Sequence, residues 1–364
     1  MAEQPASASP DEQSGTSRRW LTIAGTIAVL VLGGIVAAKT IYLGEAVDAI
    51  RTADLRLVVA AIAVYTASWP LRGRRYGDVL APMDRRLDAG FLTVAVLLSQ
   101  TANLAIPARG GDAVRAVLLK QRRAVVYATG VASLAVERLF DLLAIAVLGG
   151  LALAWLLLAG DAAPIVERIP AVSPAPSVLL LGVLGGISLL AGGIGVVVLR
   201  PSAGGWVLSR LPDRLAEGIH TATANLAVLA RRPRAITAVG VGSVAIWALD
   251  ALTAVLVLAA VADPGLLSLL AVGTLATCAG NLAKVLPLTQ GGVGLYEGAF
   301  ATSVVAIAPV AGATALAAAV LDHALKNAVT LAGGAIAAVA LHRTSATQNE
   351  EPERTGNLLG LPKK

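Results

Sequence analysis

The chain has 364 residues, of which 56% are hydrophobic and 14% are charged, and its mean hydropathy is +0.76. These values exclude a soluble fold and indicate a membrane protein built from several apolar helices. The formal net charge is +6, and the arginines lie mostly in short stretches between apolar runs, where they set topology and meet anionic headgroups. We therefore expect no nucleic-acid binding. The single cysteine and three scattered histidines predict no disulfide, no metal and no cofactor.

The first elements in chain order are a polar tail and two apolar segments. Residues 1–17 show no hydrophobic periodicity, so we expect a disordered cytoplasmic tail. The apolar run 20–38 is long enough for an uncleaved membrane-spanning helix. A second span is predicted at 55–71 and is followed by an arginine-rich loop at 72–86, which the positive-inside rule places in the cytoplasm.

The next apolar run, 91–106, ends in a polar motif and is followed by a second arginine-rich stretch at 115–123. Both stretches cannot be cytoplasmic if the run between them crosses the membrane completely. We therefore predict a re-entrant helical hairpin over 91–119, which enters from the cytoplasm and turns at 107–111. The alternative is a topology of eight full crossings, which leaves residues 115–123 outside.

The remaining predicted elements alternate across the membrane in the same way. We expect an outward span at 133–159, an inward span at 178–199, an amphipathic cytoplasmic helix within 200–234, an outward span at 235–261, a second re-entrant hairpin at 266–308 and an inward span at 311–341. The amphipathic helix lies either on the membrane surface or against another part of the protein. Both termini are cytoplasmic in this scheme.

These elements predict an all-α polytopic membrane protein with about six full transmembrane helices and two re-entrant hairpins. The transmembrane domain covers 18–342, with a first repeat at 18–160, a second repeat at 178–342 and the amphipathic linker at 200–234; residues 343–364 form a disordered cytoplasmic tail. Three crossings in each half invert the second half relative to the first, as in many transporters.

Two motifs stand at the predicted hairpin turns, and both read Asn-Leu-Ala, then Pro, then Gly-Gly, then an acidic residue. Non-helical backbone within a bilayer survives only where protein or a water-filled cavity satisfies its polar groups, so both turns should line a cavity. The half-helices that follow direct their N-terminal N–H groups at that place, which favours an anion. Arg109 and Arg115 suit a phosphate, or alternatively extend to the membrane interface.

Further charged side chains lie at depths where isolated solvation is a poor explanation. Glu137 and Asp141 share one helix face. Glu297 is expected to be neutral because it is desolvated, or to stay charged because a cation such as Lys284 or Arg109 lies close to it. Ion pairs among the buried groups, for example of Lys326 with Asp250, are the alternative to substrate contact. The predicted substrate-binding residues are Asn103, Arg109, Gly110, Gly111, Asp112, Arg115, Glu137, Arg138, Asp141, Asn281, Lys284, Gly291, Gly292, Glu297, Asp322 and Lys326.

The sequence contains no catalytic constellation that we can identify. No nucleophile elbow, P-loop or acidic loop motif of a lipid-linked glycosyltransferase is found, so we expect a protein that is not an enzyme.

Three motifs in order carry a family resemblance: Asn103 with 107–115, residues 136–141 and residues 286–297. Over about residues 20–342 the chain resembles the lysylphosphatidylglycerol synthase transmembrane region, a family of flippase-like integral membrane proteins. The resemblance implies a lipid flippase, with substrates such as aminoacylated phosphatidylglycerol or polyprenyl-phosphate sugars. The C-terminal aminoacyl-transferase domain of the best-known members is not found, and Gln290 stands where many relatives have proline.

We therefore expect a flippase of the bacterial cytoplasmic (inner) membrane that moves a phospholipid or polyprenyl-phosphate-linked sugar through a polar cavity between inverted repeats. The alternative is a non-transporting scaffold or regulator of a cell-envelope glycosyltransferase; an enzyme such as a sugar transferase ranks third. Buried charges that line a connected cavity favour transport, and a dry bundle of ion pairs favours the scaffold. The expected partners are the lipid, with a second copy of the chain or a glycosyltransferase left open.

Overall fold

The computed structural model describes residues 43–106, 109–159, 224, 227–229, 231–262, 266–285 and 288–358, and every regular element within these ranges is a helix. An all-helical membrane protein is therefore confirmed. The predicted tail at 1–17, the spans at 20–38 and 178–199, most of the linker at 200–234 and the end of the C-terminal tail lie outside the described residues.

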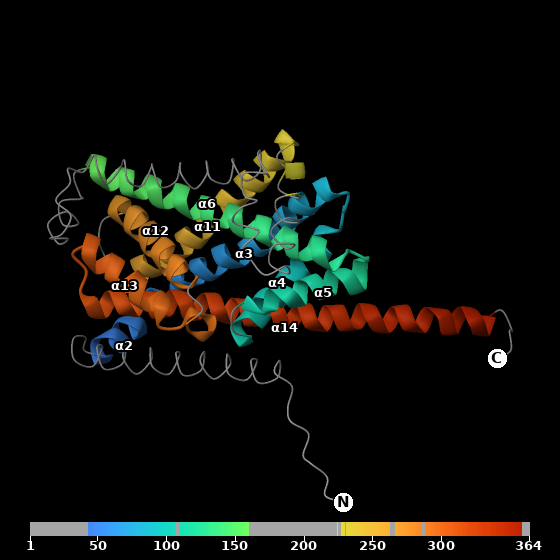
Figure 1. Ribbon diagram of the computed structural model, residues 1–364. Coiled ribbons are helices and arrows are strands. Elements are labelled where there is room, and N and C mark those ends of the chain that lie inside the picture. Colours follow the sequence, from blue (N-terminus) through green and yellow to red (C-terminus); the bar gives the residue numbers. More distant parts are fainter. Residues whose placement is uncertain are drawn as a thin grey trace, which may run out of the picture.

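Nine helices and two short 3-10 turns make up the described part of the chain (Figure 1). They are α2 (Leu43–Arg51), α3 (Leu55–Leu80), the turn Ala81–Met83, α4 (Ala89–Ala105), α5 (Gly111–Arg123), α6 (Tyr127–Ala159), α11 (Pro233–Val261), α12 (Leu266–Ala283), the turn Gln290–Gly292, α13 (Leu295–Ile307) and α14 (Gly312–Leu358).

Three of these helices are long and apolar enough to cross a membrane. They cover Tyr127–Leu158, Pro233–Val261 and Gly312–Arg343, and they correspond to predicted spans of the chain. The helices at Ala89–Ala105 and Leu269–Ala283 are apolar but shorter. The described residues thus form a multi-pass membrane domain.

Two helices extend beyond their predicted ends. α3 continues to Leu80 and carries Arg72 and Arg75 within the helix, where the sequence predicts a loop. Arg75 is buried where this part of α3 packs against Gly242 of α11, Arg72 is half-buried, and Arg74 is exposed. α14 continues to Leu358, so residues 343–358 are helical where a disordered tail is predicted. Glutamate, glutamine and arginine in that stretch are good helix formers.

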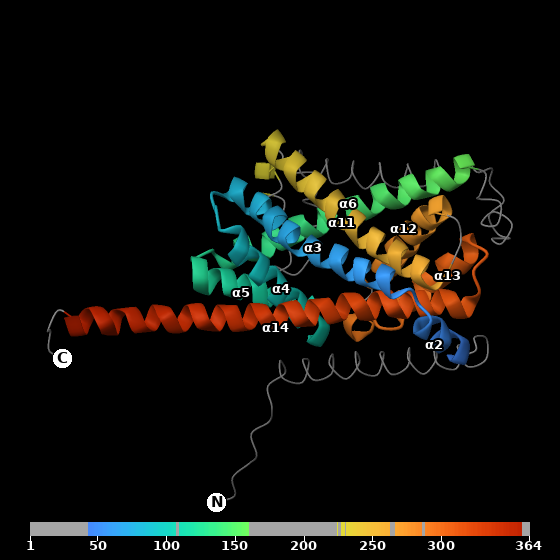
Figure 2. The same ribbon diagram turned by 180° about the vertical axis from the view of Figure 1, so that it is seen from behind.

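Helices α4 and α5 form one helical hairpin, and α12 and α13 form another (Figure 1). The open ends of the two hairpins face opposite ends of the molecule, and Figure 2 shows the same arrangement from behind. Their tips meet: the side-chain amide of Gln290 donates a hydrogen bond to the carbonyl oxygen of Ala105. The tip at 107–108 itself lies outside the described residues.

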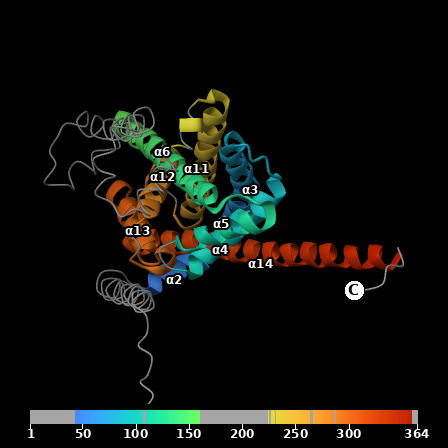
Figure 3. The ribbon, with the colours of Figure 1, turned by 45° about the vertical axis from the view of Figure 1, so that its right-hand side comes forward.

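Close helix packing holds the first hairpin together and attaches it to α14. A Cβ atom on Gly111 would lie 2.3 Å from the carbonyl oxygen of Ser99 and 2.4 Å from the amide nitrogen of Asn103. On α14, a Cβ on Gly334 would lie 2.0 Å from the hydroxyl oxygen of Thr101. Glycine at these two positions lets the backbones approach, as in many membrane helix pairs. Figure 3 shows α14 passing beside both hairpins.

Candidate functional site

The first polar cluster is centred on Glu137 of α6, whose carboxylate bridges two arginines. Arg75 Nη2 lies 2.6 Å from Oε1, and Arg115 Nη1 lies 2.6 Å from Oε2. The arginine side chains are 2% and 0% exposed, so both are fully buried. α3 and α5 are therefore fastened to α6 through one carboxylate, by charge-assisted hydrogen bonds of the strong kind.

The same cluster continues through Arg138. Its guanidinium donates to Asp141 Oδ2 at 3.2 Å and to both oxygens of Asp112 at 3.1 Å. Asp141 also receives a hydrogen bond from Arg75 Nη1 at 2.5 Å, and Asp112 receives one from the Asn103 amide at 3.1 Å. We call the six ionised residues the first charge cluster: Arg75, Asp112, Arg115, Glu137, Arg138 and Asp141. Its three positive and three negative charges balance.

The second charge cluster joins α3, α11 and α14 and consists of Arg72, Asp250, Asp322 and Lys326. Lys326 Nζ lies 3.2 Å from Asp250 Oδ2 and 3.0 Å from Asp322 Oδ2. Arg72 Nη2 lies 3.8 Å from Asp250 Oδ1. The hydroxyl of Tyr296 donates to Asp322 Oδ2 at 2.6 Å. The ion pair between Lys326 and Asp250, which the sequence offers as an alternative, is thus present in the structure.

Glu297 begins α13 and makes two contacts of different kinds. Its Oε2 accepts a hydrogen bond from the Gly294 amide at 2.7 Å, which caps the helix. Its Oε1 lies 2.7 Å from His323 Nδ1. The partner of Glu297 is therefore His323, and neither Lys284 nor Arg109 forms the ion pair that the sequence analysis considers.

The spacing between the acidic residue of each hairpin and the polar residues of the following helix is the same in both halves of the chain, and we call this spacing the shared register. On α6, Glu137, Arg138 and Asp141 follow Asp112 by 25, 26 and 29 residues; on α14, Asp322, His323 and Lys326 follow Glu297 by the same 25, 26 and 29. The contact at the spacing of 26 also recurs, between Asp112 and Arg138 and between Glu297 and His323. The two halves therefore place corresponding polar residues in corresponding contacts.

Two cations at the hairpin tips have no such partner. Arg109 and Lys284 form no ion pair within 4 Å with any described residue, and we call them the tip cations. Lys284 Nζ lies 4.5 Å from the centre of the Tyr296 ring, and Arg109 is within electrostatic range of Asp112 and Arg138 of the first charge cluster. Arg109 has a positive φ of 58°, which costs a non-glycine residue about 1–2 kcal/mol. Strain of this kind is concentrated at functional sites.

The backbone around the tips is also suited to an anion. α5 begins after Gly110 without a side-chain hydrogen bond to its first N–H groups, so those donors are available to a ligand. Gly291 and Gly292 have positive φ values of 65° and 75°. The hydroxyl of Thr289 is buried and has no hydrogen-bond partner within the described chain.

The structure brings most of the predicted residues into these groups, and it adds others. Asn281 joins the second cluster, with its amide nitrogen 3.4 Å from Asp250 Oδ2. Arg115 lies in the first charge cluster, where its Nη1 forms an ion pair with Glu137 Oε2. Sequence reasoning did not predict that Arg72, Arg75 and Tyr296 belong to the site. The shared register could have identified His323 as the contact of Glu297, because Arg138 has the same spacing from Asp112.

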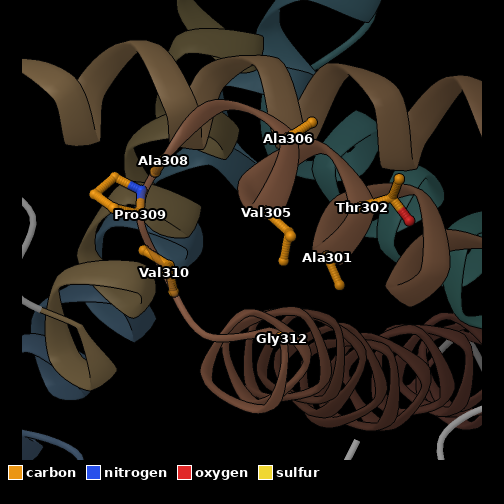
Figure 4. Close-up of a pocket in the computed structure, with 8 residues that line it drawn as sticks. All are labelled: Ala301, Thr302, Val305, Ala306, Ala308, Pro309, Val310 and Gly312. Carbon is orange, nitrogen blue, oxygen red and sulfur yellow. The ribbon is translucent and has the colours of Figure 1, made fainter. Parts of the chain in front are cut away.

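The pocket shown in Figure 4 is separate from both charge clusters. It has a volume of about 520 Å³ and lies where α13 is connected to α14 (Figure 4). None of its lining residues is charged; they are Ala301, Thr302, Val305, Ala306, Ala308, Pro309, Val310 and Gly312. This pocket suits an apolar group.

Comparison with known proteins gives two findings. Residues 21–334 match the family described as lysylphosphatidylglycerol synthase TM region. A curated relative, glycosyltransferase AglD of Haloferax volcanii, is 41% identical over 366 residues, which cover 92% of this chain and 56% of the relative. The chain thus spans little more than half the length of that relative.

Proposed function

This chain belongs to the lysylphosphatidylglycerol synthase TM region family, and we propose that it moves a lipid-linked saccharide, held by its phosphate, across the cytoplasmic membrane. No bond is made or broken in this activity, and the chain is not an enzyme. The name of the 41% identical relative refers to glycosyl transfer, which supports a saccharide headgroup over an aminoacylated phospholipid.

The tip cations carry this proposal. An unpaired cation at membrane depth is costly and marks a functional site by default. Arg109 and Lys284 come from different hairpins, whose tips meet at the hydrogen bond from Gln290 to the carbonyl oxygen of Ala105. A phosphate between them would place its negative charge against both cations and would accept hydrogen bonds from the N–H groups of Gly111 and Asp112 at the start of α5.

The arrangement of the two hairpins supports transport by inverted repeats. Their open ends face opposite ends of the molecule (Figure 1), and the polar residues follow one register in both halves. In inverted-repeat transporters the substrate site lies near the midplane, between broken helices. In this proposal α4 with α5 and α12 with α13 are re-entrant hairpins, and the meeting of their tips is the substrate site.

The direct test is lipid transport by the purified chain in liposomes. A fluorescent polyprenyl-phosphate-linked sugar is supplied, and the label that remains accessible to an external quencher is followed. Loss of one charge-assisted contact costs about 1.5–3 kcal/mol, so Arg109→Gln and Lys284→Gln should each weaken lipid binding roughly 10- to 150-fold. The matched control is Arg86→Gln, an exposed arginine in the loop before α4.

Two results contradict this assignment. Variants that transport at the wild-type rate would mean that the tip cations do not hold the phosphate. Equal losses of melting temperature and of transport would mean that Arg109 and Lys284 are structural.

Re-entry of the first hairpin is tested by labelling. Single cysteines are introduced at Arg85 and Arg122 in a Cys278→Ser background, and both should react with an impermeant maleimide only from the cytoplasmic side. Reaction of the second cysteine from outside would mean that this segment crosses the membrane completely.

A second candidate function is a scaffold or regulator of a glycosyltransferase. The completeness of the ion pairing in the first charge cluster favours it, because all six charges are satisfied by one another. In that case the chain binds the transferase in detergent and changes its rate, while liposomes that contain the chain alone move no lipid.

A further inference from the structure

The corresponding contacts of the two repeats differ in one chemical property. In the first repeat the contact pairs Asp112 with Arg138, and in the second it pairs Glu297 with His323. Arginine keeps its charge at every physiological pH, whereas an imidazole is the type of side chain that gains and loses a proton between about pH 5 and 8. Only the second of these two contacts contains a side chain of that type.

The pair is placed so that a proton can reach it. The side chain of His323 is 3% exposed, while that of Glu297 is 15% exposed, so the carboxylate is the accessible side of the contact. His323 is otherwise enclosed, and its ring centre lies 4.7 Å from that of Tyr296. Tyr296 in turn lies under Lys284 Nζ. One aromatic ring therefore touches both the titratable pair and a tip cation.

The titratable and charged groups around the contact of Glu297 with His323 come from α14 itself, from α13, α11 and α3, and from the segment after α12. They are Glu297 and Tyr296 of α13, Asp322 and Lys326 of α14, Asp250 of α11, Arg72 of α3 and Lys284 after α12. Helix α2 packs on α14 through Ala46, Ala313 and Ala317, and its carboxylates Glu45 and Asp48 are exposed. Asp250, Asp322 and Lys326 are engaged with one another, which leaves Glu297 as the direct partner of the imidazole.

We propose that the pair of Glu297 and His323 is a proton-binding site, and that a proton occupies it together with the anionic headgroup at the tip cations. This inference rests on the proposed function. Without the proton, Glu297 is an unneutralised negative charge one helix turn from the tip, and it repels a phosphate. With the proton on the imidazole, the pair is neutral, as the pair of Asp112 and Arg138 always is. The two binding events therefore favour each other, and the coupling is reciprocal.

The proton balance of one transport cycle is simple. A proton from water on one side forms an N–H bond with the His323 imidazole as the headgroup binds. When the site opens to the other side, that N–H bond breaks and the proton returns to water as the headgroup leaves. One proton moves with one lipid in the same direction, and no other reactant is needed.

The primary experiment observes His323 itself. The imidazole 15N resonances are recorded in nanodiscs, with His220→Gln and His342→Gln so that one histidine is left. The titration is repeated with a polyprenyl-phosphate-linked sugar and with a neutral polyprenol. The expected result is a change of charge between about pH 5 and 8, with a midpoint that moves to higher pH with the phosphate-bearing lipid only. An imidazole that keeps one charge state, or a midpoint that the lipid leaves in place, overturns the proposal.

Transport measurements separate this inference from the proposed function. On the alkaline side of the titration the wild-type rate should rise by up to about tenfold for each unit by which the pH is lowered, and His323→Arg should show less than about a twofold change over the same range. His342→Gln, an exposed histidine on the same helix, should keep the wild-type profile. A wild-type rate that does not depend on pH overturns proton coupling and leaves lipid transport standing. No transport by any variant defeats the proposed function, and the resonance titration still decides the proton site.

A gain-of-function variant provides an independent test in case the His323→Arg protein misfolds. Arg138→His gives the first repeat the titratable contact of the second, and it should add a second proton uptake when lipid binds. Uptake that stays at the wild-type value in a folded Arg138→His protein contradicts the correspondence between the two contacts.

Discussion

The first charge cluster lies within the first half of the chain, whereas the second joins Arg72 of the first half to Asp250, Asp322 and Lys326 of the second half. In the first cluster three arginines face three carboxylates, and each carboxylate has at least two hydrogen bonds from its surroundings. In the second charge cluster Lys326 contacts two aspartates and Arg72 contacts one of them, so two positive charges face two negative charges.

The two clusters therefore differ in the kind of cation: the first contains three arginines, and the second contains one arginine and one lysine. Removal of one member of a buried ion network is expensive. The second repeat has a lysine and a histidine where the first has an aspartate and an arginine. We infer that the first hairpin is held in place while the second responds to ligand and proton.

The largest expected effect is a loss of stability that should be greater for a variant in the first charge cluster than for one in the second. Glu137→Gln removes the carboxylate that Arg115 contacts at 2.6 Å and leaves this fully buried guanidinium only the 3.8 Å contact with Asp112, which should cost about 3–5 kcal/mol. Asp322→Asn should cost clearly less, because Lys326 still has Asp250 as its partner. Thermal unfolding in detergent measures both, with Asp48→Asn, which is 73% exposed, as the control. Equal losses for the two buried variants would remove the distinction between the clusters.

A smaller effect is expected at the packing of the first hairpin. A Cβ on Gly111 would collide with backbone atoms of α4 that cannot move aside, so Gly111→Ala should cost about 1–3 kcal/mol as an overpacked site. Gly298 of α13 has no atom within 4 Å of its ideal Cβ. Gly298→Ala should therefore leave the melting temperature unchanged or raise it. A stable Gly111→Ala protein would show that the arms of the hairpin can separate without cost.

The smallest expected effect is a gain in stability at the cost of function. Arg109→Gly removes the strain of a positive φ and should stabilise the protein by about 1 kcal/mol, while it weakens binding of the phosphate-bearing lipid. Ala124 has a positive φ of 52° at the end of α5, outside the tips. Ala124→Gly should increase the free energy of unfolding by a similar amount and leave lipid binding unchanged. If both variants bind lipid normally, the guanidinium of Arg109 has no role at the tip.

Much of the architecture follows from patterns that the sequence carries locally. The apolar runs at 133–159, 235–261 and 311–341 predict three helices that the structure contains, because twenty consecutive apolar residues leave few other options. The family assignment from the three motifs is confirmed over residues 21–334. Inverted membrane topology and re-entry of the hairpins stay predictions.

The contacts of the site depended on pairings between distant residues. Arg75 was assigned to a loop because charge at membrane depth is costly, and its compensation comes from Glu137 and Asp141, more than sixty residues later. The partner of Glu297 was likewise invisible to local reasoning. A search of the sequence for equal spacings of charged residues would have found His323, because the register of 25, 26 and 29 is present in the sequence itself.

The contact of α14 with the first hairpin depends on two adjacent glycines. An ideal Cβ on Gly333 would lie 2.8 Å from Cδ2 of Leu97, and the hydroxyl of Thr101 donates to the carbonyl oxygen of Thr330 at 2.9 Å. Side chains of α4 therefore fill the space that Gly333 and Gly334 leave on α14. Lys326 lies eight residues before Gly334, about 12 Å along the same helix, so one continuous helix connects the second charge cluster with the first hairpin.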